Sequence, residues 1–485
     1  MPAYGEIMMP ASMATVFFYL DAAADFAILG YRMQRCQFFL VTLPKNIIGE
    51  MKKTLTYICM TAFIVLMAAC GEDRTYEYEE KTQHNRWMLE VMQDKYLWAD
   101  AIKDYEPAWK EFFATPASFV SALAKYGSND LWSYVVVDTV TTDVHERGYF
   151  NHNDSYGIDF VLVTDPTGQS TRSVARVLTV YPGSPADEAG LRRNDFIYSV
   201  DTYKLSTKNI SRLKKGIGRV LEVRHIAKEA QEGTIYWSDA DTVRLGASRY
   251  VEDIAFPVRS IIGADGHKIG YLMCTRLVSG PVEQGDADTY KTALDDAMSY
   301  MKRNAVDEMV IDLRLCNYGD LDMVQRLGSY LYSQSASGTA MLKVEWNSKN
   351  AANNRTVPYD ASVASLGIDK VAVITSAYTK GAAEWLIQAL VHDMGKENVI
   401  VVGTPTAGQN VMTAEVGHDY HLHLCPAVAY VCDADGNHDY GSIVPDMKME
   451  EQEYVELGEY GSMDEVLFNA SVELMHGRGQ DDSQE

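Results

Sequence analysis

The chain has 485 residues, of which 47% are hydrophobic and 23% are charged, as in folded domains and unlike disordered chains. This length allows two or three domains with cores of their own. The formal net charge of −24 argues against nucleic acid and anionic membrane surfaces as partners, because both would repel the chain.

Residues 51–69 have the pattern of an export signal. Met51–Lys53 forms a positively charged start, an apolar run continues to Ala69, and Cys70 and Gly71 follow. The run is short for a membrane span, which needs about 20 apolar residues. We therefore expect a lipoprotein signal peptide and a lipid on Cys70, with the chain exported and anchored in the cell envelope, on its periplasmic or surface face.

The segments on either side of this signal carry no folded domain in our interpretation. Residues 1–50 are expected to be an upstream extension produced by a wrongly chosen start codon, because a signal peptide should stand at the N-terminus. The alternative is a genuine extension close to the membrane, but Asp21 and Asp25 interrupt its apolar stretch. Residues 70–84 are acidic and polar, and we expect them to link the anchor to the folded part.

A small helical module is predicted over residues 85–150. Apolar side chains recur at steps of three and four residues from Trp87 to Leu97, which indicates a helix. A second helical run is predicted from Ala108 to Tyr126.

Residues 151–248 predict a β-rich domain. A glycine opens the strand Gly157–Leu162, and Tyr181–Leu205 contains a Pro-Gly turn, a short helix that ends at Gly190, and a strand. This order resembles a PDZ domain, in which a peptide carboxyl terminus adds as a strand and backbone N–H groups bind its carboxylate. The peptide-binding residues that the resemblance implies are Gly157, Ile158, Asp159 and Phe160.

Two alternatives remain open for this domain. It could bind peptides, or it could only pack against the next domain. The carboxylate of Asp159 would repel a ligand carboxylate unless strand alternation turns the side chain away.

Residues 249–460 alternate strands and helices, which predicts a sheet covered by helices. The predicted strands are Lys268–Met273, Glu308–Leu313 and Val371–Thr375, and the predicted helices are Asp286–Asn304, Leu321–Leu331 and Thr379–Val391. Residues 461–485 are expected to be a tail, polar from about His476.

Four segments of this third region carry a family resemblance. They are Asp312-Leu313-Arg314 followed by Gly319, then Thr379–Glu384, Gly403–Gly408 and Gly441–Asp446. With the PDZ-like domain they resemble the C-terminal-processing (tail-specific) serine peptidases over nearly all of residues 85–455. The resemblance implies a multidomain α+β protein: a small helical N-terminal module, a PDZ-like β-rich domain, and an α/β peptidase core of βαβ type similar to the ClpP/crotonase-like fold.

The reacting residues of that family are missing. The family uses a serine nucleophile and a lysine base, and a serine attacks only when a base removes its proton. The resemblance places Gly381 at the nucleophile position, Gln409 at the base position and Thr413 at the position that orients the base. Ala383 and Tyr318 are further departures from the family pattern.

Part of the catalytic frame is nevertheless expected to persist. Glu384 is retained, and the backbone N–H groups of Gly319 and Ala382 are candidates for an oxyanion hole. Thr379 or Ser376 could act as a substitute nucleophile beside Lys380. We do not favour this substitution, because neighbouring residues at a helix start point in different directions and nucleophile geometry is tightly constrained.

No metal or cofactor is expected. His421 and His423 would share a strand face near His418, but the sequence offers no well-spaced third and fourth ligand. Cys274 and Cys316 lie in apolar strands and are expected to be free buried thiols. Whether Cys425 and Cys432 pair is left open, because spacing alone does not fix disulfide geometry.

These features favour an inactive peptidase homologue that binds peptides or protein C-termini at the cell envelope. It would touch the membrane only through its anchor and would not bind nucleic acid; the sequence does not indicate its oligomeric state. One alternative is an active serine-type endopeptidase. Another is a purely structural envelope lipoprotein.

Overall fold

The computed structural model describes residues 75–127, 130–137, 154–227, 235–252, 254–281, 288–332 and 338–477. The chain divides into two compact units, Met1–Glu80 and Lys81–Glu485. The elements below belong to the second unit, apart from the start of the first helix. None of the described helices is both long and apolar enough to cross a membrane. The predicted extension, the signal peptide and Cys70 lie outside the described residues.

The first part of the described chain is largely helical. Its elements are α3 (Thr75–Lys95), α4 (Ala99–Ile102), the 3-10 helix η2 (Glu111–Phe113), α5 (Pro116–Ala124) and β1 (Tyr134–Val137). Helix α3 begins inside the predicted linker because that segment, although it lacks an apolar stripe, is rich in Glu, Lys and Gln, which favour helices. The predicted helix over 108–126 is split, since the side chain of Thr115 caps a new helix with Pro116 in its first turn.

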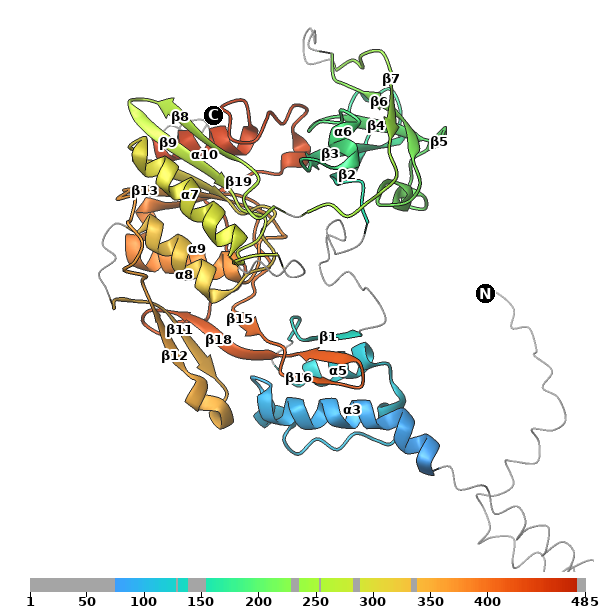
Figure 1. The fold of residues 1–485 in the computed structure, drawn as a ribbon, viewed down its shortest axis with the longest axis vertical. Coiled ribbons are helices and arrows are strands. Elements are labelled where there is room, and N and C mark those ends of the chain that lie inside the picture. The colour runs from blue at the N-terminus through green and yellow to red at the C-terminus, as the bar shows by residue number, and fades with distance from the viewer. Residues whose placement is uncertain are drawn as a thin grey trace, which may run out of the picture. The chain divides into compact units, whose positions relative to one another are not determined.

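The second part is a six-stranded sheet with five strands in the order β2-β3-β4-β6-β7 and the sixth, β5, paired to β4 (Figure 1). Its elements are β2 (Ile158–Thr164), β3 (Ser173–Val180), α6 (Pro185–Glu188), β4 (Phe196–Val200), β5 (Tyr203–Lys204), the 3-10 helix η3 (Ile210–Leu213), β6 (Arg219–Arg224) and β7 (Asp241–Leu245). We call it the PDZ-like unit. Strand β2 lies at one edge of this sheet, the place from which a sheet can accept a further strand.

The third part is built on a six-stranded sheet in the order β19-β14-β13-β10-β9-β8. Its strands are β8 (Arg259–Ala264), β9 (His267–Met273), β10 (Glu308–Asp312), β13 (Lys370–Thr375), β14 (Val399–Gly403) and β19 (Met447–Lys448). The strands from β9 to β19 run parallel, and only β8 is antiparallel to its neighbour. The central strands are buried on both faces, which explains their almost continuous apolar sequence.

Helices cover both faces of this sheet. Helices α7 (Thr289–Arg303), α8 (Leu321–Leu331) and α9 (Ala382–Met394) pack on the face that holds Val371 and Val373. Helix α10 (Val466–Met475) packs on the opposite face, against Ala372 and Ile374, with Phe468 fully buried. The predicted tail over 461–485 is therefore wrong in its first half, because an apolar helix in that segment completes the core.

A second, four-stranded sheet in the order β12-β11-β18-β15 adjoins the helices. Its strands are β11 (Ala340–Trp346), β12 (Arg355–Pro358), β15 (Val411–Thr413) and β18 (Ala427–Asp433). A small sheet of β1, β16 (Gly417–Asp419) and β17 (Leu422–Cys425) packs on the N-terminal helices through Leu422 and Leu424. Three short 3-10 helices complete the part, η4 (Ser348–Asn353), η5 (Lys396–Asn398) and η6 (Glu451–Glu453).

Buried ion pairs join the PDZ-like unit to this third part. Arg193 of the PDZ-like unit forms ion pairs with Glu451 and with Glu465, which caps helix α10. Arg314, which follows β10, is 2% exposed and pairs with Asp312 and with the same Glu465. Two guanidinium groups thus share carboxylates that arrive from the C-terminal segment.

Candidate active-site cleft

The loops after β13 and β14 bring Gly381 and Gln409 together. These strands pair in parallel register, so both loops leave the sheet at the same edge. A Cβ atom built on Gly381 would lie 3.3 Å from Oε1 and 3.4 Å from Cδ of Gln409. The positions that the resemblance assigns to nucleophile and base therefore face each other, and neither carries a group that could attack or remove a proton.

The backbone at Gly381 keeps an unusual conformation. Its φ of 58° and ψ of −116° lie in a region that residues with a side chain rarely adopt, and it immediately precedes α9. A sharp, strained turn between a strand and a helix is how hydrolases of α/β type expose a nucleophilic serine. This conformation also explains why the predicted helix Thr379–Val391 begins at Ala382 instead.

A buried glutamate holds the two loops in place. The Glu384 carboxylate accepts hydrogen bonds from N–H of Gly381 at 2.9 Å, of Gly408 at 2.6 Å and of Gln409 at 2.7 Å. It also accepts one from the hydroxyl of Thr406. Burial raises the pKa of Glu384, although these hydrogen bonds act in the opposite direction. One side chain therefore fixes the distance between the nucleophile and base positions.

The Gln409 loop is held by two further contacts. The carboxamide Nε2 of Gln409 donates to the carbonyl of Val411 at 3.1 Å, and the Gln409 carbonyl accepts from the indole of Trp385 at 3.1 Å. Thr413, at the position that orients the base in the family, lies in β15 and lines the same cavity as Gly381 and Gln409, which is described below.

The hydroxyl groups that could replace the missing serine are engaged elsewhere. Thr379 is fully buried, and its hydroxyl donates to the carbonyl of Leu313 at 2.8 Å. The Ser376 hydroxyl donates to the carbonyl of Arg314 at 2.6 Å. Both residues therefore anchor the loop to the end of β10, and neither hydroxyl faces Gln409.

The two oxyanion-hole candidates lie side by side. A Cβ atom built on Gly319 would fall 2.6 Å from Cβ of Ala382, so only glycine fits at this position. Ala382 is the first residue of α9, where backbone N–H groups have no partner within the helix. Tyr318, with 42% of its surface exposed, lines the cavity next to them.

These residues line a cavity of about 610 Å³. The N-terminal part contributes Leu131–Tyr134 to its wall, and β15 and the following turn contribute Met412–Glu415. Lys380 and Arg355 bring positive charge, and Asp320 and Asp322 bring negative charge. The cavity is large enough for several side chains of an extended peptide and offers polar groups of both signs.

The predicted peptide-binding residues of the PDZ-like unit lie at the start of its edge strand. Gly157 precedes β2 with a φ of 75°, and a Cβ atom there would fall 2.1 Å from Cβ of Ser184, so glycine is required. Its N–H donates to the hydroxyl of Ser155 at 3.0 Å. Ile158, Asp159 and Phe160 are all buried. A peptide carboxylate entering here would have to displace the Ser155 hydroxyl.

The placement of the histidines near β17 differs from the predicted one. His421 lies in the turn between β16 and β17 with a φ of 59°, so it does not share a strand face with His423. Instead, the rings of His418 and His423 stack with centroids 4.3 Å apart across the hairpin. The turn interrupts the strand that the sequence pattern assumed.

The four cysteines of the described chain are free and buried. Cys425 and Cys432 lie in strands of different sheets, β17 and β18, and do not pair. Burial raises the pKa of Cys425, which lines the cavity, to about 11. Its thiol is therefore protonated at neutral pH and is a poor nucleophile.

The comparisons with known proteins agree with this architecture. Residues 176–214 match the model of the PDZ domain, and residues 268–449 match that of peptidase family S41. No curated protein matches the sequence.

The comparison with solved structures also finds an S41 protease. A protein from Bacteroides fragilis NCTC 9343 described as an S41 protease superposes with a TM-score of 0.71 at 27% identity, over 81% of this chain and 97% of its own. The photosystem II D1 C-terminal processing protease reaches a TM-score of 0.44 at 16% identity, over 78% of this chain and 95% of its own, which is too distant to support an argument. The two family models and the close superposition lead to one conclusion: the chain carries a PDZ domain, matched over residues 176–214, before a core that matches peptidase family S41 over residues 268–449.

Proposed function

We propose that this S41 family member is catalytically inactive and binds extended peptides or protein C-termini at the cell envelope. One observation carries the proposal: Gly381 faces Gln409 at the positions of nucleophile and base. Glycine has no side chain to attack with, and a carboxamide does not accept a proton near neutral pH. An oxyanion hole alone supports little turnover, since losing the serine of subtilisin costs about 10⁶ in rate.

The binding role rests on what the cleft retains. Glu384 holds both loops, Gly319 still packs on Ala382, and the cavity remains open beside them. The edge strand β2 offers a second place where a peptide could add as a strand.

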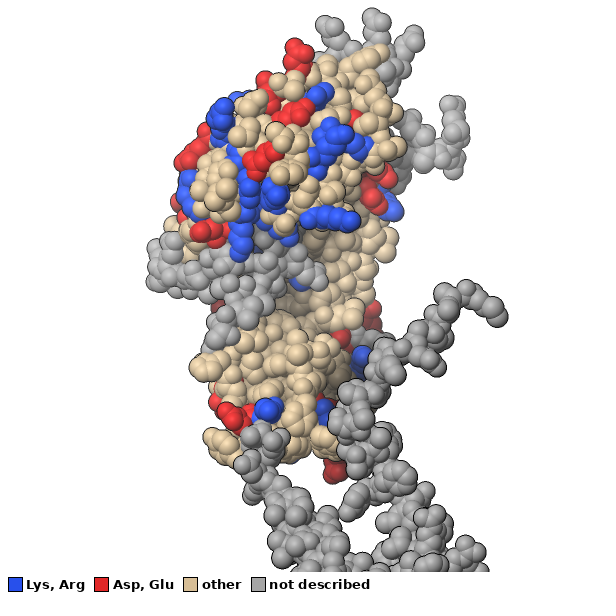
Figure 2. Space-filling model, turned by 90° about the vertical axis from the view of Figure 1, so that its right-hand side faces the viewer, with Lys and Arg blue, Asp and Glu red and all other residues tan. Residues whose placement is uncertain are grey.

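The charge of the PDZ-like unit is compatible with a ligand carboxylate. Lys and Arg side chains gather over this unit on the face shown in Figure 2, with acidic side chains between them. A carboxyl terminus would therefore meet a far less acidic surface than the net charge of −24 suggests.

The envelope location rests on the leader sequence. The apolar run before Cys70 and the acidic segment after it support export and lipidation of Cys70. Labelling cells with a fatty-acid analogue should mark the wild-type chain and leave Cys70→Ala unmarked. Equal labelling of the two chains would reject the anchor.

The test of inactivity is incubation of the purified chain with an unfolded polypeptide and a fluorogenic peptide library. We expect no cleavage above background. Robust turnover that disappears in Thr379→Val or Ser376→Ala, with folding verified by circular dichroism, would show that a substitute nucleophile exists and would overturn the proposal.

A gain-of-function variant tests the assignment of the two positions. Gly381→Ser combined with Gln409→Lys should restore measurable peptidase activity, with each single variant as control. If the folded double variant is as inactive as the single ones, the assignment of these positions loses its support.

Binding is tested by titrating peptides with free and amidated carboxyl termini. We expect the free form to bind more tightly, and Tyr318→Ala to weaken binding in the cleft. Tyr300→Ala, an exposed tyrosine on α7, is the matched control. Equal affinity for both peptide forms would rule out carboxylate recognition, and an unaltered affinity in Tyr318→Ala would place the ligand outside the cleft.

A further inference from the structure

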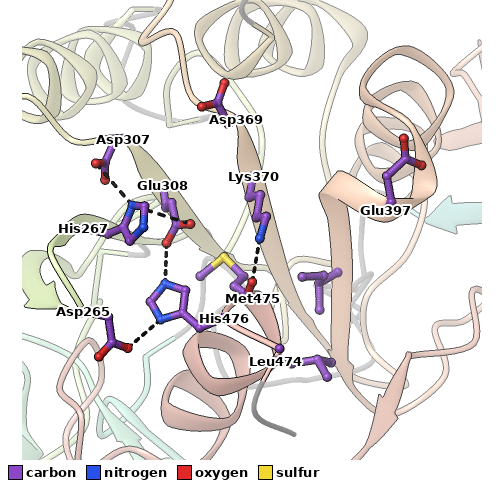
Figure 3. Close-up of a pocket in the computed structure, with 12 residues that line it drawn as sticks. Asp265, His267, Asp307, Glu308, Asp369, Lys370, Glu397, Leu474, Met475 and His476 are labelled. Atoms are coloured by element: carbon purple, nitrogen blue, oxygen red, sulfur yellow. Dashed lines mark hydrogen bonds and ion pairs between the residues drawn. The ribbon is translucent and has the colours of Figure 1, made fainter. Parts of the chain in front are cut away.

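A second cavity, of about 830 Å³, lies at the end of the core sheet where the parallel strands begin (Figure 3). It is lined by the residues with which β9, β10 and β13 begin, His267, Glu308 and Lys370, and by the C-terminal end of α10. The cleft described above is formed where the same strands end. The second cavity is therefore a separate feature of the fold.

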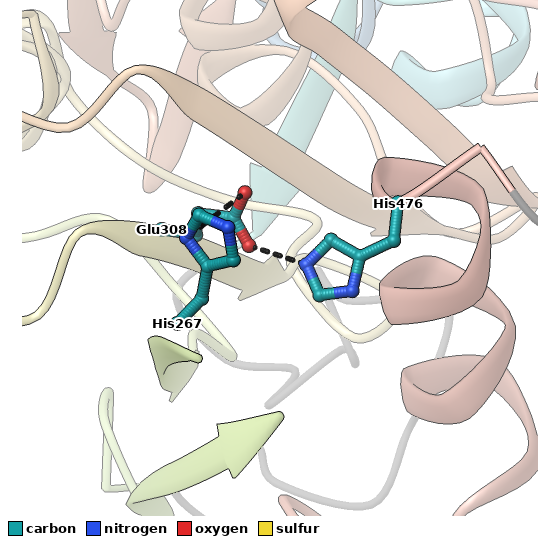
Figure 4. A group of neighbouring side chains, drawn as sticks. All are labelled: His267, Glu308 and His476. Atoms are coloured by element: carbon teal, nitrogen blue, oxygen red, sulfur yellow. Dashed lines mark hydrogen bonds and ion pairs between the residues drawn. The ribbon is translucent and has the colours of Figure 1, made fainter. Parts of the chain in front are cut away.

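Two histidines converge on one carboxylate in this cavity. His267, at the start of β9, and His476, directly after α10, both point toward Glu308 at the start of β10 (Figure 4). Nε2 of His476 lies 2.8 Å from Oε2 of Glu308, and Nδ1 of His267 lies 3.9 Å from Oε1. One ligand atom from each residue lies within 4.8 Å of the others.

The neighbouring carboxylates orient the two rings. Asp265 Oδ2 lies 2.9 Å from Nδ1 of His476, and this contact holds the ring with its Nε2 toward Oε2 of Glu308. The pairing of a histidine with a carboxylate on its far nitrogen is the usual second shell of a metal ligand.

The charges around the cluster also favour a cation. Five carboxylates line the cavity against one lysine; they belong to Asp265, Asp307, Glu308, Asp369 and Glu397. The ammonium of that lysine, Lys370, donates to the carbonyl of Met475 at 2.8 Å, where it caps the end of α10. Glu308 itself is 4% exposed, and a carboxylate so deeply buried needs a compensating positive charge.

We propose that His267, Glu308 and His476 form a binding site for a divalent transition metal, with zinc as the best-suited ion. Two imidazoles and one carboxylate are a zinc ligand set, and bonds of about 2.0–2.1 Å require ligand atoms roughly 3.3 Å apart in a tetrahedral site. The present separations, 2.8 Å for His476 to Glu308 and 3.9 Å for His267 to Glu308, lie on either side of that value, so binding would require the two histidine side chains to adjust. Asp307, whose Oδ2 lies 3.4 Å from Nδ1 of His267, is placed to supply the fourth ligand.

The metal would tie three segments that are distant in the sequence. It would link the hairpin of β8 and β9 to β10 and to the end of α10. The site would therefore hold the helix against the sheet, and it would take no part in chemistry at the cleft. Its occupancy is independent of whether the cleft binds peptides, so the two proposals can fail separately.

The test is calorimetric titration of the purified, untagged full chain with zinc chloride at neutral pH. We expect one zinc per chain, bound more tightly than calcium or magnesium because imidazole ligands favour zinc. His267→Ala and His476→Ala should each weaken binding by more than about 10-fold, and Asp265→Ala by about 10-fold or more through loss of ring orientation. Cobalt added in place of zinc should give the visible absorption of a four-coordinate ion.

The control is a second histidine pair in the described part of the chain. His423→Ala removes a ring that stacks on His418 and contacts Glu415, and it should leave zinc binding unchanged. His267, with 47% of its side chain exposed, can be replaced with little risk to folding. If zinc does not bind the wild type, or binds equally well to folded His267→Ala and His476→Ala, the site does not exist and the cluster is a set of ion pairs between carboxylates and protonated histidines.

Discussion

At the scale of single residues, two features define the cleft. Glu384 holds its two loops together, and Gly381 has no side chain. The carboxylate of Glu384 binds both loops, so their spacing does not depend on a serine or a lysine being present. Gly381 keeps a backbone conformation that costs a residue with a side chain about 1–3 kcal/mol. Glycine at this position avoids that strain, and the arrangement of the loops around it does not depend on a side chain there.

Gly381→Ala should lower the free energy of unfolding by about 1–3 kcal/mol, because the new Cβ would occupy a strained conformation against the Gln409 side chain. Gly246→Ala is the matched control, since no atom lies within 4 Å of a Cβ there and the φ is ordinary. Urea denaturation of the two variants measures the difference. Equal free energies of unfolding for the two variants would contradict the strain argued for position 381.

Glu384→Gln should destabilise the fold by about 2–3 kcal/mol, because the carboxamide has one acceptor oxygen where three N–H groups and a hydroxyl require partners. The variant should also bind peptides more weakly. Glu397→Gln, an exposed carboxylate on η5, is the control for charge removal. Unaltered stability of Glu384→Gln would show that the loops are held by other contacts.

At the scale of elements, the apolar periodicity of the sequence predicted the helices and strands of the core. The prediction failed at the start of α9 and at α10. Helix α8 and strand β13 follow the predicted ranges closely because their apolar pattern decides their structure. The start of α9 was misplaced because a tertiary contact fixes the conformation of Gly381. Helix α10 was missed because its partner strands lie far away in the sequence, and only their exposed apolar face requires it.

The ion network between the PDZ-like unit and the C-terminal segment predicts a dependence on pH. Burial would raise the pKa of Glu451, but Arg193 and Arg314 lower it below its usual value of 4.5. A carboxyl group with a lowered pKa stabilises the fold above pH 4.5, and the contribution is lost as the pH falls through its folded-state pKa. Wild-type stability should therefore decline in acid more steeply than that of Glu451→Gln in urea titrations below pH 4.5. Parallel curves would exclude Glu451 as the titrating group.

At the scale of the whole molecule, the two candidate sites occupy opposite ends of the same strands. The family resemblance located the cleft in the sequence, because its loops carry recognisable glycines. The histidine cluster could not be found in this way, since His267, Glu308 and His476 are far apart in the sequence and only the parallel pairing of β9 with β10, together with the placement of α10, joins them.

Zinc should leave peptide affinity unchanged within about twofold, because a strand of six residues separates the sites by roughly 20 Å at about 3.3 Å per residue. Zinc should nevertheless raise the midpoint of thermal unfolding, since it binds the folded chain. Peptide titrations with and without zinc measure the first effect, and thermal scans measure the second. A large change in peptide affinity would show that α10 transmits a signal across the sheet.

Glu465, the counterion that Arg314 shares with Arg193, affects how the chain folds. Glu465 lies 151 positions after Arg314, and Glu451 also belongs to the C-terminal segment; without these two residues the guanidinium would be buried beside Asp312 alone. Intermediates that form the sheet before residue 465 arrives would expose an apolar face and a poorly compensated charge, both of which promote aggregation. The third part should therefore fold late and in one cooperative step, slowly, as expected of a parallel sheet with distant contacts. The export proposed above would benefit from that delay.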